Sequence, residues 1–284
     1  MRPALIVLLA LCAGLLPVPA AAQRLLTLDW TVAETLVALG HPPAGVAQVA
    51  DYHSWIGEPR LPASTIDLGL RNQPSMELMA ALRPDAVLIT PMFAGMQARL
   101  SRIAPVVSLP LHAPDDAPWA RLEAATRALG AMTGREAAAE ALIDGTAAAL
   151  ARTGRRLRDS GRDADALLIV QLADERHVRV YAGNSLYQQV LDRLGLRNAW
   201  TGPVNDWGYR LLGLHELAGL EGRVVIVRPA PLGTLQRLQR NTLWQRLPIA
   251  NRHPPIVLPP VWSLGGLPSA RRFADLLDRA LPPP

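Results

Sequence analysis

The sequence predicts an α/β protein made of two lobes that are joined by one long helix. In each half of the chain, short apolar runs of strand length alternate with longer amphipathic stretches, which is the pattern of parallel α/β units. Between the halves, residues 135–158 form a continuous helical pattern. Removal of a 22-residue leader from the 284 residues leaves 262, a length compatible with one large domain or two modest ones, and the organisation of the chain favours two. We therefore expect a first lobe over residues 23–134, an inter-lobe helix over residues 135–161 and a second lobe over residues 162–284.

The leader, residues 1–22, has the pattern of a cleavable secretory signal peptide. Arg2 gives it a basic start, residues 4–16 form an apolar run, and small residues lead to a cleavage point after Ala22. The apolar run is too short to cross ~30 Å of hydrocarbon as a helix. The single cysteine, Cys12, lies inside this run after a leucine, which is unfavourable for lipidation. We expect an exported, soluble mature protein whose fold depends on its core and not on disulfides.

The first lobe should begin with a strand and alternate from there. A helix over residues 31–39 is expected to be capped by Thr31 and closed at Gly40, and a helix over residues 74–82 to have Pro74 in its first turn. The strands expected in this lobe cover residues 24–28, 45–49, 86–90 and 105–109.

The second lobe repeats the same alternation. Its expected strands cover residues 166–172, 178–181, 224–227 and 256–258. Its expected helices cover residues 184–194, 212–220, 233–247 and 268–281.

The inter-lobe helix should make the molecule stiff. At 1.5 Å per residue, residues 135–158 extend about 36 Å, enough to run between two lobes. Gly145 and Gly154 each cost such a helix about 1 kcal/mol relative to alanine, so packing must supply part of its stability. A single long helix resists bending, and we expect a cleft that is largely formed before a ligand arrives.

Composition and motifs exclude several classes of function. The isoelectric point is near 10.2, but every basic residue is an arginine and no basic run is interleaved with aromatic residues, which argues against a nucleic-acid interface. The six histidines show no paired spacing, so no metal site is expected. The chain carries no Gly-x-Ser-x-Gly, His-Glu-x-x-His or phosphate-binding glycine motif. We therefore predict a protein that is not an enzyme.

Residues 66–78 are the most informative stretch of the chain. An apolar run ends at Arg71, and a helix opened by Pro74 follows, so the arginine sits at a chain reversal from which its side chain can project into a cleft. Arginine presents a planar fork of permanently charged donors. Tryptophan, of which the chain has seven, offers a broad rigid surface with one donor.

Several stretches of the chain resemble the substrate-binding proteins of iron-siderophore ABC importers, and among them the binders of ferric hydroxamates such as ferrichrome. Asp-Leu-Gly-Leu-Arg at 67–71 and Gly-Asn-Ser-Leu at 183–186 carry the resemblance when taken together and in order. Further similar stretches cover residues 26–30, 51–59, 72–77, 103–105, 187–188, 198–200, 205–208 and 260–262. The resemblance implies the class III periplasmic binding protein fold and a ferric hydroxamate siderophore as ligand.

The resemblance also implies roles for individual residues. Arg71 would be the principal donor to the hydroxamate oxygens, and Trp55, Trp207 and Trp262 would line the cleft, with Tyr209 supporting its wall. Phe93 stands where the ferrichrome binder has a hydrogen-bonding tyrosine, so it would keep the ring, lose the hydroxyl and favour a different siderophore. We assign the remaining tryptophans to packing: Trp30, Trp119, Trp200 and Trp244. Because the chelator already surrounds iron with six oxygens, no cofactor and no metal ligand from the protein are expected.

The same resemblance implies a monomer that works in the periplasm and docks onto an inner-membrane ABC permease. Glu77 stands where the docking acid of the first lobe is expected. In the second lobe the corresponding position is His215, so the adjacent Glu216 is the candidate. Two alternatives stay open: a binder of another large iron chelate, haem or a corrinoid, and a secreted α/β hydrolase, which would need a nucleophile and base that the sequence does not reveal.

Overall fold

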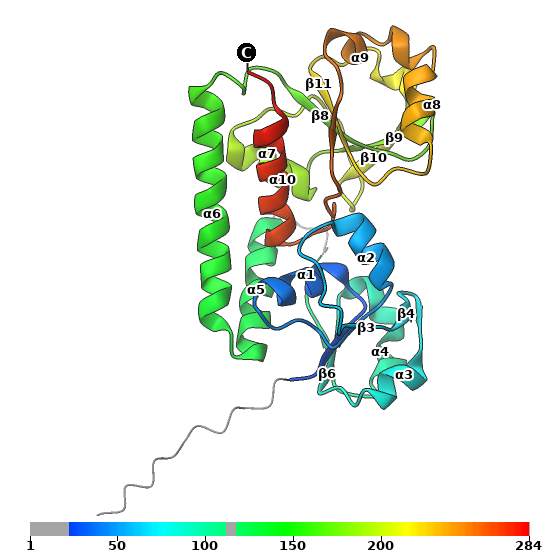
Figure 1. Cartoon of the computed structure of the whole chain (residues 1–284), viewed down its shortest axis with the longest axis vertical. Coiled ribbons are helices and arrows are strands. Elements are labelled where there is room, and N and C mark those ends of the chain that lie inside the picture. Colours follow the sequence, from blue (N-terminus) through cyan, green and yellow to red (C-terminus); the bar gives the residue numbers. More distant parts are fainter. Residues whose placement is uncertain (1–22, 112–117, 284) are drawn as a thin grey trace, which may run out of the picture.

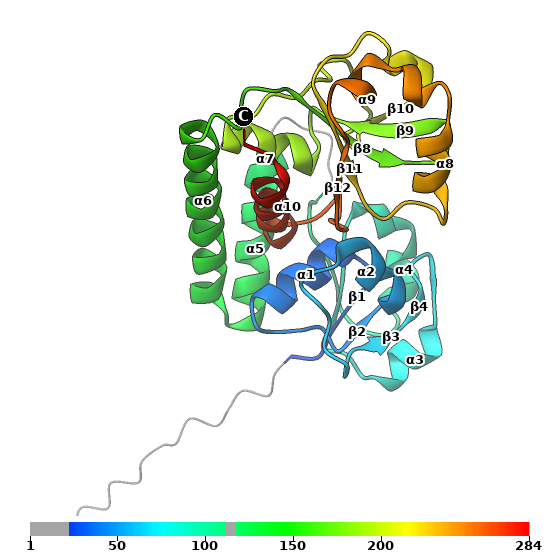
Figure 2. The same cartoon turned by 45° about the horizontal axis from the view of Figure 1, so that its top comes forward.

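The computed structural model describes residues 23–111 and 118–283 and has two α/β lobes stacked along its long axis (Figures 1 and 2). The predicted leader, residues 1–22, lies outside the described residues. Each lobe is built on a five-stranded sheet with helices on both faces. Core clusters lie on both sides of each sheet, which explains why the central strands read as continuous apolar runs.

The sheet of the first lobe is entirely parallel, with the order β3-β2-β1-β6-β7. Its four predicted strands are present, and β3 extends the sheet at one edge. A small antiparallel hairpin, β4 (Gly69–Leu70) and β5 (Gln73–Pro74), follows β3 and carries the chain reversal predicted around Arg71. The sheet strands are β1 (Leu25–Thr27), β2 (Gly45–Val46), β3 (Ile66–Asp67), β6 (Ala86–Ile89) and β7 (Val106–Ser108).

The predicted starts of two helices in this lobe were wrong. Helix α1 (Trp30–Ala38) is capped by Asp29 and not by Thr31, because the Asp29 carboxylate accepts hydrogen bonds from the N–H groups of residues 31 and 32 at 2.8 and 3.2 Å. Pro74 lies in β5, and Ser75 caps the helix that follows, α3 (Met76–Ala81). The remaining helices of this half are α2 (Val49–Ile56), the 3₁₀ turn η1 (Pro91–Met96), α4 (Gln97–Leu100) and α5 (Pro118–Thr133).

The sheet of the second lobe is mixed, with the order β10-β9-β8-β11-β12. Strands β8, β11 and β12 are parallel, whereas β9 runs antiparallel to both β8 and β10. The four predicted strands are present, and β10 was not expected. The strands are β8 (Leu167–Leu172), β9 (His177–Tyr181), β10 (Tyr209–Gly213), β11 (Arg223–Val227) and β12 (Ile256–Leu258).

Two predicted helices of this lobe were wrong in extent. The helix expected over residues 212–220 is a 3₁₀ turn, η2 (Leu214–Leu217), because β10 occupies its beginning. The helix expected over residues 233–247 breaks at Asn241, whose side-chain oxygen accepts hydrogen bonds from the N–H groups of residues 243 and 244. The pieces are α8 (Thr234–Arg240) and η3 (Trp244–Arg246), followed by α9 (Pro248–Arg252); α7 (Leu186–Leu194) and α10 (Leu267–Ala280) are close to prediction.

The long helix α6 (Glu136–Asp159) runs beside both lobes (Figure 1). Its buried stripe includes Ile143, Leu150 and Leu157 and packs in the same core as α7 and α10. Gly154 is required by this packing, since a Cβ atom there would lie 2.7 Å from the carbonyl oxygen of Leu194 at the end of α7. The predicted cost of this glycine is therefore offset by a close helix contact.

The chain passes between the lobes a second time beside α6. After β12, residues 259–266 return to the first lobe, and α10 starts there and runs back to the C-terminal end (Figure 1). Glu34 of α1 fixes the first turn of α10 to the first lobe. Its carboxylate accepts hydrogen bonds from the N–H of Gly266 at 2.5 Å and from the Ser269 hydroxyl at 2.6 Å. The Thr31 hydroxyl donates to the carbonyl of Leu264 at 2.6 Å. Burial raises the pKa of Glu34 to about 7.

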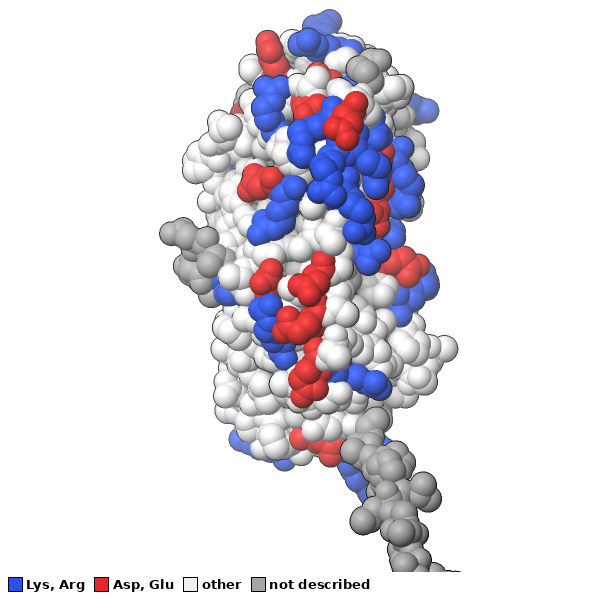
Figure 3. Space-filling view, turned by 90° about the vertical axis from the view of Figure 1, so that its left-hand side faces the viewer, with Lys and Arg blue, Asp and Glu red and all other residues white. Residues whose placement is uncertain are grey.

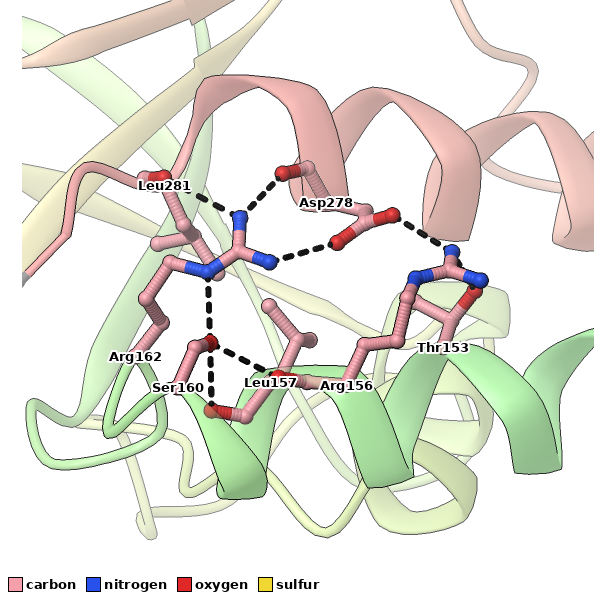
Figure 4. A network of polar contacts seen from close by, with 7 residues as sticks. All are labelled: Thr153, Arg156, Leu157, Ser160, Arg162, Asp278 and Leu281. Carbon is pink, nitrogen blue, oxygen red and sulfur yellow. Dashed lines mark hydrogen bonds and ion pairs between the residues drawn. The ribbon is translucent and has the colours of Figure 1, made fainter.

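A polar network ties α10 to α6 at the other end (Figure 4). The Asp278 carboxylate pairs with Arg156 of α6 at 2.5 Å and with Arg162 at 3.0 Å. Arg162 also donates to the backbone carbonyls of Asp278 and Leu281. Helix α10 is thus fastened to the first lobe at its beginning and to the C-terminal end of α6 at its end.

The outer face of α6 is divided by charge. In Figure 3 acidic side chains gather over the lower half of this face and arginines over the upper half. Three acids of α6 are in its first half, Glu136, Glu140 and Asp144, and a fourth, Asp159, is its last residue; its exposed arginines are in the last turns, Arg152, Arg155, Arg156 and Arg158. This order complements the helix dipole. Within residues 23–111 and 118–283, no helix is both long and apolar enough to cross a membrane.

Candidate functional site

A cavity of about 450 Å³ lies between the two lobes. On the first-lobe side its wall includes Trp30, Trp55, Arg71 and Met92. The second-lobe sheet contributes Gln171, Arg179, Tyr181 and Tyr209, while Trp207 and Trp262 come from loops. The cavity is therefore rich in rings and carries one guanidinium on each side.

Arg71 is positioned by the hairpin of β4 and β5. Its Nε donates to the carbonyl oxygen of Leu28 at 3.1 Å, and Nη2 lies 3.7 Å from the sulfur of Met92. The guanidinium carbon lies 4.5 Å from the centre of the Trp30 ring. These contacts fix the plane of the fork while leaving Nη1 for a ligand.

The charge of Arg71 is balanced from within the protein. Burial lowers the pKa of the guanidinium, and the nearby carboxylate of Asp29 counteracts this. Asp29 is itself 1% exposed and accepts a hydrogen bond from the Thr90 hydroxyl at 2.9 Å in addition to capping α1. A half-buried cation with its counter-charge behind it can donate hydrogen bonds to neutral or anionic oxygens in the cavity.

Three tryptophans form the aromatic floor of the first-lobe side. The ring centre of Trp262 lies 5.0 Å from that of Trp30 and 5.8 Å from that of Trp55, both in edge-on geometry. The Trp30 indole N–H donates to the carbonyl of Ala47 at 2.9 Å. Trp30 was predicted to pack, and it does so at 4% exposure, yet its ring also borders the cavity under Arg71.

Five of the six predicted ligand residues line this cavity, and Phe93 lies behind them. The turn η1 directs Phe93 into the core cluster around Leu26 and Val87, where it is 6% exposed. Its ring centre lies 5.2 Å from the Arg71 guanidinium carbon. Phe93 therefore supports Arg71, and Met92 takes the neighbouring place in the wall.

The second-lobe wall follows from the alternation of strand β9. Val178 and Val180 point into the core, so Arg179 and Tyr181 face the cavity. Arg179 lies opposite Gln171 of β8, and Tyr181 lies opposite Tyr209 of β10.

Polar contacts order this wall. The Tyr181 hydroxyl donates to the Gln171 side-chain oxygen at 2.6 Å, and burial raises the pKa of Tyr181 to about 12. Sequence reasoning missed Gln171, Arg179 and Tyr181. The signal that could have found two of them is the period-two placement of Arg179 and Tyr181 between valines in residues 177–181.

Trp207 projects from a tight turn between the lobes. The Asn205 side-chain oxygen accepts hydrogen bonds from the N–H groups of Trp207 and Tyr209 at 3.0 and 3.2 Å. Gly208 has φ of +76°, and a Cβ atom there would lie 2.6 Å from the backbone of Ser185. Trp207 is 39% exposed and also borders a much smaller hollow of about 50 Å³.

The two predicted docking acids lie outside the cavity on different lobes. Glu77 is exposed in the first turn of α3. Glu216 is exposed in η2, and its carboxylate accepts a hydrogen bond from the N–H of Gly213 at 2.7 Å.

Within the part of the chain that the structure describes, no group of three or more His, Cys, Asp or Glu side chains could hold a metal ion. The described histidines are dispersed: for example, His177 pairs with Asp174 at 2.9 Å, and His253 lies 3.5 Å from Asp165. None of the described histidines lines the cavity.

Comparisons with known proteins agree with this architecture. The model of the periplasmic binding protein family matches residues 25–260. The iron(3+)-hydroxamate-binding protein FhuD of Escherichia coli strain K12 is 31% identical over 260 residues, which cover 91% of this chain and 87% of that protein. The achromobactin-binding periplasmic protein of Dickeya dadantii is 28% identical over 275 residues, covering 90% of this chain and 86% of that protein.

A solved structure is similar over nearly its full length. The siderophore-binding protein FhuD of Vibrio cholerae, crystallised with Fe³⁺-Desferal, superposes with a TM-score of 0.87 at 30% identity. The match covers 92% of this chain and 98% of that chain. The two-lobed class III fold predicted from the sequence is therefore confirmed.

Proposed function

This chain belongs to the periplasmic binding protein family, and we propose that it captures a ferric hydroxamate siderophore and delivers it to an inner-membrane ABC importer. Support comes from the similarity to the two FhuD proteins and from the chemistry of the cavity. The observation that carries the proposal is the placement of Arg71 above an aromatic floor, inside a cavity of about 450 Å³ between the lobes.

A ferric hydroxamate matches these groups. Its rim of oxygens needs hydrogen-bond donors, which Arg71 supplies, and its methyl and methylene groups need apolar surface, which Trp55, Trp207 and Trp262 supply. In this proposal the chelator keeps all coordination sites of the iron, and the protein binds no metal and catalyses no reaction. The hydrolase alternative receives no support, since no described histidine reaches the cavity to act as a base.

We further propose that the mature protein works as a periplasmic monomer after removal of residues 1–22. Docking onto the permease would use one exposed acid on each lobe. Glu77 is free to do so at the start of α3, whereas Glu216 would have to exchange its hydrogen bond with the N–H of Gly213. Such exposed charges set orientation and encounter more than affinity.

Titration of the intrinsic tryptophan fluorescence tests the proposal. Ferrichrome and ferrioxamine B should quench the fluorescence, because the rings of Trp207, Trp262 and Trp55 would lie near the iron chromophore. The iron-free chelators serve as controls for binding without the chromophore. Saturable quenching by haem or cobalamin alone would select the alternative ligand class, and turnover of ester substrates would select the hydrolase.

A further inference from the structure

The second-lobe wall of the cavity carries a guanidinium that the proposed function does not use. Arg179 lies in the middle of β9, between Gln171 of β8 and Leu211 of β10, and its side chain borders the cavity. Its guanidinium carbon lies 5.5 Å from the centre of the Tyr209 ring. Arg179 also borders an adjoining hollow, so its head is accessible from the cleft.

The Arg179 guanidinium has no hydrogen-bond acceptor among the residues that the structure describes. Within residues 23–111 and 118–283, the Arg179 side chain makes no hydrogen bond and no ion pair; it lies over the Tyr209 ring, and its charge acts on the nearby Tyr181 hydroxyl. Arg71, in contrast, is tethered to the carbonyl of Leu28 and compensated by Asp29. Arg179 therefore keeps its full set of donors for a partner in the cavity.

The side-chain amide of Gln171 adds a further donor to the second-lobe wall of the cavity. Gln171 is 1% exposed, and its side-chain oxygen is occupied by the Tyr181 hydroxyl. Its Nε2 has no hydrogen-bond partner among the described residues. Buried donors without an acceptor are uncommon, so the wall around Arg179 has more donors than the protein satisfies.

The charged groups of the cavity are Asp51, Arg71 and Arg179. Asp51 belongs to the first-lobe side, where its carboxylate accepts a hydrogen bond from Gln48 at 2.5 Å. Iron(III) bound by three hydroxamates is neutral, and the proposed function assigns its oxygen rim to Arg71. The Arg179 guanidinium, on the wall opposite Arg71, is electrostatically complementary to a ligand that carries a negative charge away from the iron.

We propose that Arg179 is a specificity-determining residue that selects ferric hydroxamates bearing a carboxylate on the end that faces the second lobe. This inference rests on the proposed function, since it requires the hydroxamate core to be held by Arg71. The carboxylate would accept charge-assisted hydrogen bonds from the Arg179 fork.

Three forms of one chelator differ in the charge at one end and share the same iron-binding core. Ferrioxamine B ends in a cationic amine; acetylation of that amine makes it neutral, and succinylation makes it anionic, while the ferric trihydroxamate core stays the same. In fluorescence titrations at low salt, the succinyl form should bind the wild-type protein about tenfold more tightly than the acetyl form, with the free amine weakest. The differences in affinity among the three forms should become smaller at high salt, because the charges are near solvent.

Substitutions assign the preference to one residue. Arg179→Gln should reduce the ratio of succinyl to acetyl affinity to within about twofold. Arg179→Glu should reverse the order in favour of the amine. Arg176→Gln, an exposed arginine of the same lobe outside the cavity, removes the same charge and should keep the wild-type ratio.

The outcomes distinguish the two proposals. Equal affinity of the wild-type protein for all three forms would overturn the role of Arg179, as would a charge preference that survives in Arg179→Gln or disappears in Arg176→Gln. Binding of the acetyl form in every variant shows in the same experiment that the fold and the hydroxamate site are intact. If the wild-type protein binds none of the three, the proposed function fails and this inference with it.

Discussion

The buried Glu34 makes the stability of the molecule depend on pH in a way that one substitution should remove. Glu34 lies in α1 and accepts hydrogen bonds from Gly266 and Ser269 at the start of α10. Burial raises its pKa from 4.5 to about 7, so the folded protein holds this proton more tightly than the unfolded chain. The stability that the proton contributes is complete below pH 4.5 and is lost as the pH rises through 7.

The magnitude follows from the same two values. One pKa unit corresponds to about 1.4 kcal/mol, so the raised pKa of Glu34 is worth up to about 3 kcal/mol between pH 4.5 and pH 8. Glu34→Gln keeps the size of the side chain and an oxygen acceptor but cannot ionise. The free energy of unfolding of the wild-type protein minus that of Glu34→Gln should therefore fall by about this amount across the range.

Urea unfolding followed by tryptophan fluorescence at pH 4.5, 6 and 8 measures this difference. Subtracting the variant from the wild-type protein removes the contributions of all other titrating groups. Glu136→Gln, at an exposed position in the first turn of α6, is the matched control and should leave the difference flat. A constant difference between wild type and Glu34→Gln would show that the buried carboxyl group does not hold its proton, and the reasoning would be refuted.

Four further substitutions test the site and the connection between the lobes. Arg71→Ala should weaken binding of a ferric hydroxamate by about 2 kcal/mol in calorimetric titrations, since charge-assisted hydrogen bonds are lost; unchanged affinity would remove Arg71 from the site. Gly154→Ala should lower thermal stability by about 1–3 kcal/mol because its Cβ would lie 2.7 Å from a carbonyl oxygen of α7, whereas Gly145→Ala, with nothing within 4 Å, should raise it by up to about 1 kcal/mol. Equal effects of the two glycine substitutions would contradict the packing described for α6. Asp278→Asn should lower the unfolding temperature by a few degrees, since two ion pairs are lost, and no change would show that this network is not stabilising.

The sequence was most informative where local pattern and burial agree. The central strands, such as β8 and β11, are buried on both faces and read as unbroken apolar runs, so they could be located closely. Strand β10 was missed because it is an edge strand with exposed Arg210 and Leu211, and the apolar residues that follow it resemble a helix. The cap at Asp29 was missed because Thr31, two residues later, is an equally good capping residue by type.

The site was only partly predictable, for a physical reason. Arg71 and the loop tryptophans are recognisable from local motifs, so five of the six predicted residues were brought to one cavity. Gln171 of β8 and Arg179 of β9 are brought together at that cavity because they are paired across the two strands, on the side of the sheet opposite Val178 and Val180, and this pairing is a property of the tertiary fold. The position of Phe93 behind Arg71 depends on the path of a single 3₁₀ turn, which composition does not reveal.

The double connection of the lobes has a kinetic consequence. Helices α6 and α10 run side by side, and α10 is bound to the first lobe at its beginning and to the end of α6 at its own end. Opening the cleft would therefore require both helices to bend together. A receptor whose walls keep their spacing loses little conformational entropy when it is occupied, and its association rate is governed by diffusion and desolvation of the cargo rather than by a hinge. The same route serves for release, so the dissociation rate depends on the contacts that the cargo makes in the cavity and not on bending of α6 and α10.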